Sequence, residues 1–303
     1  MPTRPIHEPR RDDCPWCGAP GPRTRLRAPD LRHGRPGTFT LDECRACTHV
    51  FQNPRLTPEG LALYGAAGTV WRRARRRDHR GTGRAVRRYC PEPESWLDVG
   101  TGDAAFPAAV KELFPYTSFD GTDPTERVTA AAEEERIEEA YVGHLGRPGL
   151  PRRLRGRYDV VSLLGSLVRA PDARAELRAA VDAVRPGGYL VLELPDPDSA
   201  WASLLGKWWH AHTQPHHLQL LPLPNVRAEL EGTGCRVLEE DRVTAHRPTD
   251  LSTALDLRLG RGLPTPLARA LVTTAHATDI ALAPLLSRTP FTNTYRVLAH
   301  KPL

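Results

Sequence analysis

At 303 residues, with 40% hydrophobic and 26% charged residues, the chain has the composition of a globular protein with one large domain and a smaller module. No apolar run approaches the roughly 20 residues that span a bilayer, and the first residues lack the apolar core of a signal peptide. From these features we expect a cytoplasmic protein. The net charge of +6 is weak evidence for a nucleic-acid partner, because only three of the 42 basic residues are lysine and the excess reflects an arginine bias.

Four cysteines near the N-terminus form two C-x2-C pairs separated by 26 residues. The pairs are Cys14–Cys17 and Cys44–Cys47. Each spacing lets two sulfurs face one tetrahedral metal from a single turn, so the set predicts a structural Zn²⁺ site with four thiolates. His33 or His49 is an alternative ligand, and two disulfides are an alternative that a reducing cytoplasm disfavours. We expect residues 1–60 to form a zinc-ribbon-like module.

A basic segment follows, and we expect residues 61–89 to form a helical linker. Arginines cluster at Arg72–Arg77 and Arg84–Arg88. A solvated helix face is the simpler interpretation, and a surface for an anionic substrate or RNA is the alternative.

A short apolar strand then ends in Asp98, and a turn with Gly100 and Gly102 leads into a helix-forming segment. Strand, glycine turn and helix N-terminus are the arrangement in which backbone approaches a nucleotide-like ligand. The next apolar segment ends in Asp123, 25 residues after Asp98, where a carboxylate can hold a ribose diol. Two more strands are expected at 158–164 and 185–193.

Residues 201–217 concentrate half of the six tryptophans and a third of the twelve histidines. The segment follows the carboxyl end of a strand, so its rings can wall an acceptor pocket, and His216 or His217 can take a proton there. Packing of the tryptophans and backbone capping by the histidines is the alternative interpretation.

The C-terminal part is predicted to contain a helix at 225–232 and a strand at 235–243. A Leu- and Ala-rich insertion near 249–288 should form two helices, separated at Pro264 and Pro266, that cover the pocket or form a dimer face. The last strand is expected at 293–300, antiparallel and at the sheet edge.

Four segments together resemble the class I S-adenosylmethionine (SAM)-dependent methyltransferases. They are Leu97–Gly102, Gly121–Pro124, Tyr158–Val161 and Arg185–Tyr189. The resemblance implies an α/β fold with a Rossmann-like, seven-stranded, doubly wound sheet over residues 90–303. It implies SAM as cofactor, bound by Asp98, Gly100, Gly102, Asp123, His144, Leu145 and Leu164. Three positions depart from the family pattern, namely Ala104 for a third glycine, His144 for an acid and Arg169 for a histidine.

The cysteine module is similar to the N-terminal zinc module of C-methyltransferases that act on nucleotide sugars. We therefore expect transfer of a methyl group to an O, N or C atom of a small molecule, in bacterial natural-product or sugar metabolism. An RNA-modifying methyltransferase and a non-catalytic or repurposed SAM-binding protein are the alternatives. The residues leave the oligomeric state open.

Overall fold

A computed structural model describes residues 6–64, 75–147, 150–259 and 264–303. The chain divides into two compact units. Unit 1 comprises residues 1–68, 195–225 and 246–294, and unit 2 comprises residues 69–194, 226–245 and 295–303. Segments 195–225 and 246–294 therefore belong to the unit that contains the cysteines, although the sequence groups them with a methyltransferase domain at 90–303.

Unit 2 is built on a seven-stranded sheet with the order β10-β11-β8-β7-β4-β5-β6. The strands are β4 (Ser95–Val99), β5 (Ser118–Asp123), β6 (Ala140–Val142), β7 (Tyr158–Leu164), β8 (Val184–Pro195), β10 (Arg236–Asp241) and β11 (Thr294–His300). β8, β7, β4, β5 and β6 pair in parallel, whereas β11 is antiparallel to β10. The predicted Rossmann-like fold class is confirmed, and strands occur in all the segments where the sequence predicts them.

The expected position of the last strand was wrong. β11 lies between β10 and β8, and β10 is the edge strand. Burial explains the order, because β11 is buried at six successive residues whereas β10 is nowhere fully buried. A strand covered on both faces belongs inside a sheet, and the charged run Glu239–Asp241 suits an edge.

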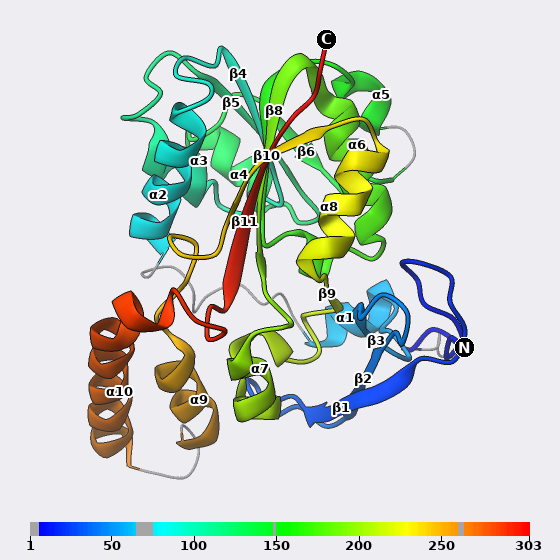
Figure 1. Ribbon diagram of the computed structural model, residues 1–303, viewed down its shortest axis with the longest axis vertical. Helices are drawn as coiled ribbons and strands as arrows, with labels where there is room; N and C mark the ends of the chain where they lie inside the picture. Colours follow the sequence, from blue (N-terminus) through cyan, green and yellow to red (C-terminus); the bar gives the residue numbers. More distant parts are fainter. Residues whose placement is uncertain (1–5, 65–74, 148–149, 260–263) are drawn as a thin grey trace. The chain divides into compact units, whose positions relative to one another are not determined.

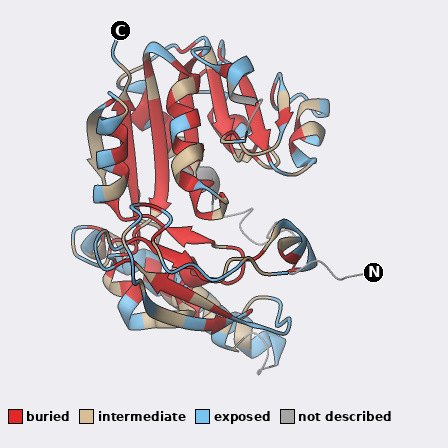
Figure 2. Ribbon diagram, turned by 90° about the vertical axis from the view of Figure 1, so that its right-hand side faces the viewer, coloured by how far each residue is buried: buried red, intermediate tan, exposed pale blue. Residues whose placement is uncertain are grey.

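Helices cover both faces of this sheet, as a doubly wound fold requires. Figure 1 shows α2 (Arg75–Arg87), α3 (Ala105–Val110) and α4 (Arg127–Glu133) on one side. The other side carries α5 (Leu150–Leu154), α6 (Ala173–Ala183) and α8 (Leu223–Gly232). Most residues of β4, β5, β7, β8 and β11 are buried (Figure 2). At the centre of the core, Trp96 contacts the rings of Phe106, Phe114 and Phe119.

Unit 1 contains a four-stranded antiparallel sheet with the order β1-β2-β3-β9. Its strands are β1 (Arg23–Pro29), β2 (Thr38–Glu43), β3 (Val50–Gln52) and β9 (Gln219–Leu220). A short helix, α1 (Pro58–Tyr64), packs Tyr64 against Phe39 of β2. β9 follows the tryptophan- and histidine-rich segment 201–217 along the chain and pairs with β3. This segment is therefore connected to the sheet of the cysteine module.

The rest of unit 1 is helical. It consists of α7 (Ala200–Leu205), the short helices η2 (Gly206–Trp208) and η3 (His210–His212), α9 (Asp250–Leu259) and α10 (Thr265–Leu286). The predicted pair of helices near 249–288 is confirmed, and α10 begins at the predicted break, with Pro264 as its N-cap. Among the described residues, no helix is long and apolar enough to cross a membrane.

Candidate functional site

Asp98 lies near the carboxyl end of β4, and its side chain is almost fully buried. Its Oδ1 accepts a hydrogen bond of 2.6 Å from Ser162 Oγ on the neighbouring strand β7. Ser162 in turn accepts from Trp96 Nε1 at 2.9 Å. Burial raises the pKa of Asp98 to about 6, and the Asp123 carboxylate adds to the shift. A buried carboxylate at a strand end is ready to bind an ammonium group, which would favour its ionised form.

The two glycines of the turn after β4 are needed for different reasons. Gly100 has φ +75°, and a Cβ there would lie 2.5 Å from Ser166 Cβ, so this glycine allows the turn to pack against the residues after β7. Gly102 has φ +59°, and its missing Cβ would meet only Asp123 Oδ2 at 3.9 Å. Gly102 thus leaves open space where a ligand can approach the backbone. Ala104 adopts the left-handed conformation, with φ 54°, in place of the family's third glycine.

Asp123 ends β5 and holds the glycine turn in place. Its Oδ2 accepts from the Gly102 backbone N–H at 3.0 Å, and its Oδ1 accepts from the Thr125 N–H at 2.9 Å and the Thr125 hydroxyl at 2.5 Å. An ionised carboxylate has about four acceptor positions, so one remains for a diol. The sequence does not reveal this structural task of Asp123.

His144 and Leu145 lie in the loop after β6, and Glu176 of α6 holds that loop. Glu176 accepts from the N–H groups of Leu145 at 3.1 Å and Gly146 at 2.7 Å. His144 Nδ1 lies 4.0 Å from Glu176 Oε1, and burial lowers the pKa of His144, which is therefore neutral near pH 7. Sequence reasoning missed Glu176, because no motif links it to a loop 30 residues earlier.

The residues after β7 complete this edge of the sheet. Leu164 is the last residue of β7, and Ser166 follows it at the start of η1 (Leu167–Arg169). Within the described part of the chain, the hydroxyls of Thr122 and Ser166 are buried without a hydrogen-bond partner. All seven predicted cofactor residues therefore lie at the carboxyl-end edge of one sheet. Two carboxylates, an open glycine and unsatisfied hydroxyls fit the ammonium and ribose of SAM.

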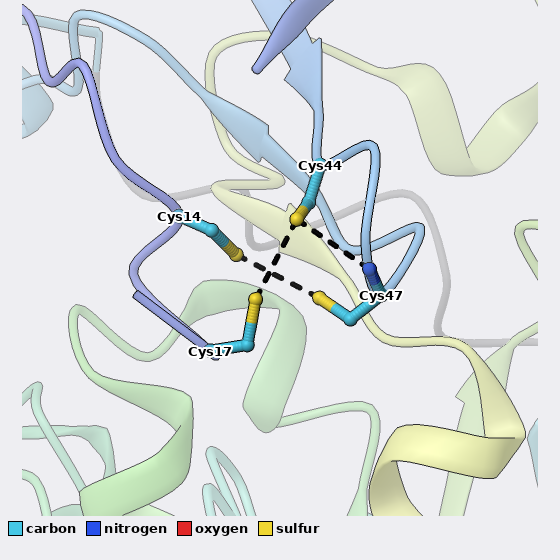
Figure 3. Close-up of side chains that lie close together, drawn as sticks. All are labelled: Cys14, Cys17, Cys44 and Cys47. Carbon is cyan, nitrogen blue, oxygen red and sulfur yellow. Dashed lines mark hydrogen bonds between the residues drawn. The ribbon is translucent and has the colours of Figure 1, made fainter. Parts of the chain in front are cut away.

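The four cysteines meet at one point in unit 1 (Figure 3). Their Sγ atoms lie within 4.8 Å of one another, with 3.7 Å between Cys14 and Cys47 and 3.5 Å between Cys17 and Cys44. A disulfide requires about 2.05 Å, whereas Zn–S bonds of about 2.3 Å give tetrahedron edges of about 3.8 Å. Backbone N–H groups of Trp16 and Ala46 point at Cys14 and Cys44 Sγ, each at 3.4 Å.

The alternative histidine ligands occupy other positions. His49 is buried, with its Nδ1 3.7 Å from Cys14 Sγ, and its ring stacks on Phe51. His33 instead contacts the ring of His216, with 5.7 Å between centroids. Among the described residues, the ligand atoms that all lie within 4.8 Å of one another are therefore the four cysteine Sγ atoms.

The tryptophan- and histidine-rich segment belongs to unit 1, whereas the predicted cofactor residues belong to unit 2. Trp209 is fully buried and donates to Asp250 Oδ1 at 3.0 Å, and His212 Nδ1 donates to the Gly206 carbonyl at 2.8 Å. Burial lowers the pKa of His212 to about 4. These two residues therefore pack the segment, as the alternative interpretation holds.

His217 forms a hydrogen bond of 2.9 Å between Nδ1 and the Ala211 carbonyl. A carbonyl only accepts, so Nδ1 carries the proton and Nε2 is the basic nitrogen of the neutral ring. His216 is buried against His33.

The basic linker is described only in part. Arg72 and Arg73 lie outside the described residues, and so do the side chains of Arg75–Arg77. Arg88 pairs with Glu239 at 2.7 Å, as expected for a solvated surface.

The fold and the edge of its sheet define a class I SAM-dependent methyltransferase. The family model described as a methyltransferase domain matches residues 70–240, more than half of the chain, and the chain belongs to this family. No curated protein matches the chain.

Two solved structures have similar folds. The cyclase SpnF has a TM-score of 0.52 and 17% identity, over 79% of this chain and 85% of that one. Haemonchus contortus phosphoethanolamine N-methyltransferase 2, solved with phosphomonomethylethanolamine and S-adenosylhomocysteine (SAH), has a TM-score of 0.50 and 15% identity, over 74% of this chain and 53% of that one.

Proposed function

We propose that the chain transfers the methyl group of SAM to an O, N or C atom of a small molecule, in bacterial natural-product or sugar metabolism. The observation that carries the proposal is the set Asp98, Gly102 and Asp123, at adjoining strand ends of a methyltransferase domain. When bound, SAM supplies an activated methyl group on its sulfonium. The second structural neighbour supports a small-molecule acceptor, because that N-methyltransferase was solved in complex with the small molecule phosphomonomethylethanolamine and SAH.

The residues of this edge bind and orient the cofactor. Asp98 would pair with the ammonium group, and the remaining acceptor position of Asp123 would hold the ribose diol. Gly100 and Gly102 would let the backbone approach the cofactor, and Leu145 and Leu164 would pack against it. The neutral imidazole of His144 would take the place of the family's acid beside the adenine. Positioning of the two reactants and exclusion of water supply most of the rate enhancement in such a transfer.

His217 is the better candidate for a base, since its Nδ1–H is fixed on the Ala211 carbonyl and its Nε2 is oriented by that bond. His216 is the second candidate. A nucleophile that is already deprotonated would need neither histidine.

The cysteine cluster is proposed to bind one structural Zn²⁺. Four sulfurs at near-tetrahedral separations form a closed set with no open coordination position, so the ion would stabilise the two turns and take no part in chemistry. Asn225 Nδ2 donates to the Cys47 carbonyl at 2.9 Å, and this bond links the site to the first turn of α8.

Calorimetry with SAH tests the proposed function. We expect Asp98→Asn to weaken SAH binding at least tenfold, because a charge-assisted hydrogen bond contributes about 1.5–3 kcal/mol. Glu126→Gln is the matched control, since it removes an exposed charge at the N-cap position of α4 that makes no capping hydrogen bond. Equal SAH affinity in the wild type and Asp98→Asn would contradict the proposed site. SAH binding without methyl transfer to any acceptor in a metabolite extract would favour the repurposed SAM-binding protein.

A further inference from the structure

Arg169 is a partly buried arginine without an ion-pair partner among the described residues. Three other arginines of unit 2 that are partly or fully buried lie beside a carboxylate: Arg80 beside Glu112, Arg174 beside Glu229 and Arg296 beside Glu193. In the described part of the chain, by contrast, no carboxylate oxygen lies within 4.0 Å of the Arg169 guanidinium, and none of the guanidinium N–H groups donates a hydrogen bond. Burial lowers the pKa of Arg169, which reflects the desolvation of its charge. A partly buried charge without a partner lowers the stability of the fold, because its lost hydration is not replaced. Such unfavourable features are concentrated at binding sites.

The short helix η1 directs Arg169 toward the cofactor edge. The Arg169 N–H donates to the Ser166 carbonyl at 3.0 Å, and side chains three residues apart in a 3₁₀ helix lie on one side. Ser166 faces the glycine turn, because its Cβ lies 2.5 Å from the position that a Gly100 Cβ would occupy. Arg169 therefore points to the same edge, where it is within electrostatic reach of Asp123.

The order of the strands places the backbone of η1 at one end of the predicted cofactor site. The ribose and adenine residues follow β5 and β6, on one side of β4, whereas η1 follows β7, on the other side. The Arg169 charge reaches back toward those residues, within electrostatic range of Asp123, Arg127 and His144. Ribose and adenine carry no anionic group, so they offer this guanidinium no ion pair. The buried Ser166 hydroxyl, which has no partner among the described residues, lies at the same end.

We propose that Arg169 binds an oxyanion of the methyl acceptor, so that the acceptor carries a phosphate, a diphosphate or a carboxylate. This inference rests on the proposed function and narrows its substrate class. A guanidinium offers a planar fork of N–H donors that matches such groups in two parallel hydrogen bonds, and it stays charged at all physiological pH values. The Ser166 hydroxyl supplies a further donor. Held in this way, the anionic group would fix the orientation of the acceptor relative to the sulfonium.

Titration of SAH-saturated protein with pyrophosphate, followed by calorimetry at low ionic strength, tests the proposal. We expect millimolar or tighter binding to the wild type and at least tenfold weaker binding to Arg169→Gln. Arg169→Lys, which keeps the charge but loses the fork, should be intermediate. Arg147→Gln is the matched control, because Arg147 is exposed in the loop after His144, and it should bind pyrophosphate within twofold of the wild type. The melting temperature of each variant reports on its folding.

Separate titrations with SAH and with 5′-methylthioadenosine, which lacks the amino-acid group, distinguish the two sources of an oxyanion. Arg169→Gln should bind both within twofold of the wild type. A loss of SAH affinity with unchanged methylthioadenosine affinity would overturn the proposal, because the arginine would then hold the cofactor's own carboxylate. Absent or equal pyrophosphate binding by the wild type and Arg169→Gln would also overturn it. A wild type that fails to bind SAH would refute the proposed function, and pyrophosphate titration of the ligand-free protein would still test Arg169.

Discussion

The cysteine cluster of unit 1 and the cofactor edge of unit 2 are assembled in different ways. Each pair of cysteines lies within a single turn, so the spacing along the chain largely determines the geometry of half a site. The cofactor edge collects residues from the ends of four strands, and side chains such as Ser162 and Glu176 hold it together from elsewhere in the fold. A site made of local turns should fail as a whole when one ligand is lost. A site distributed over a sheet should weaken in parts.

The largest effect is expected from Cys44→Ser. Loss of one of four thiolates should abolish zinc binding, which contributes about 10–16 kcal/mol in small zinc-dependent folds, and should unfold the N-terminal part of unit 1. Elemental analysis of protein purified without chelators should find one zinc per wild-type chain and less than a tenth of that in the variant. Cys90→Ser is the control, because Cys90 lies outside the cluster. A wild type without metal would refute the zinc site.

His217→Gln tests whether unit 1 takes part in the chemistry. If His217 Nε2 accepts the proton, turnover should fall about 100-fold while SAH affinity stays within twofold, since a general base contributes roughly 10²–10⁴-fold. His212→Gln is the matched comparison, because His212 is buried in a packing role. It should lower the melting temperature and leave the turnover of folded molecules unchanged. Wild-type turnover by His217→Gln would place the base elsewhere or make it unnecessary.

Glu176→Ala should produce a partial loss at the distributed site. It leaves the N–H groups of Leu145 and Gly146 without their acceptor, at about 1–3 kcal/mol each in stability. The loop that carries His144 should loosen, so we expect roughly tenfold weaker SAH binding, measured by calorimetry, together with the lower stability measured in urea. Glu133→Ala changes an exposed acid and should alter neither quantity. Unchanged SAH affinity in a destabilised Glu176→Ala would limit Glu176 to a structural role.

The smallest effect is a pH dependence of SAH affinity. Burial raises the pKa of Asp98 to about 6, so the ligand-free site holds a proton below that pH. An ammonium group binds the ionised carboxylate, and affinity should therefore fall as the pH drops through 6, approaching tenfold per pH unit. The same shift gives ligand-free protein a stabilising contribution that is full below the unfolded-state pKa and is lost as the pH rises through 6. Calorimetry between pH 5 and 8 measures the affinity, and a slope that persists in Asp98→Asn would assign it to another group.

Two kinds of information in the sequence sufficed for most of the fold. Apolar segments that end in Asp98 and Asp123 predict parallel strands, and the glycine turn predicts the cofactor edge, because both signals depend on neighbours in the chain. The predicted edge position of β11 was wrong, because the order of strands in a sheet depends on which strands other elements bury on both faces. The three successive acids of β10 and the apolar run Val297–Ala299 of β11 are a signal in the sequence that would have indicated the right order.

The sequence by itself determined the cysteine turns, the strand-ending acids and the glycine turn, since each is specified by residues only a few positions apart. Only the tertiary structure decided that Glu176 holds the loop of His144, that Ser166 packs on Gly100, and that β9 joins the sheet of the cysteine module. It also left Arg169 without a carboxylate among the described residues. These relations depend on burial and hydrogen bonding between distant segments, and no local pattern encodes where a buried donor or charge will find its partner.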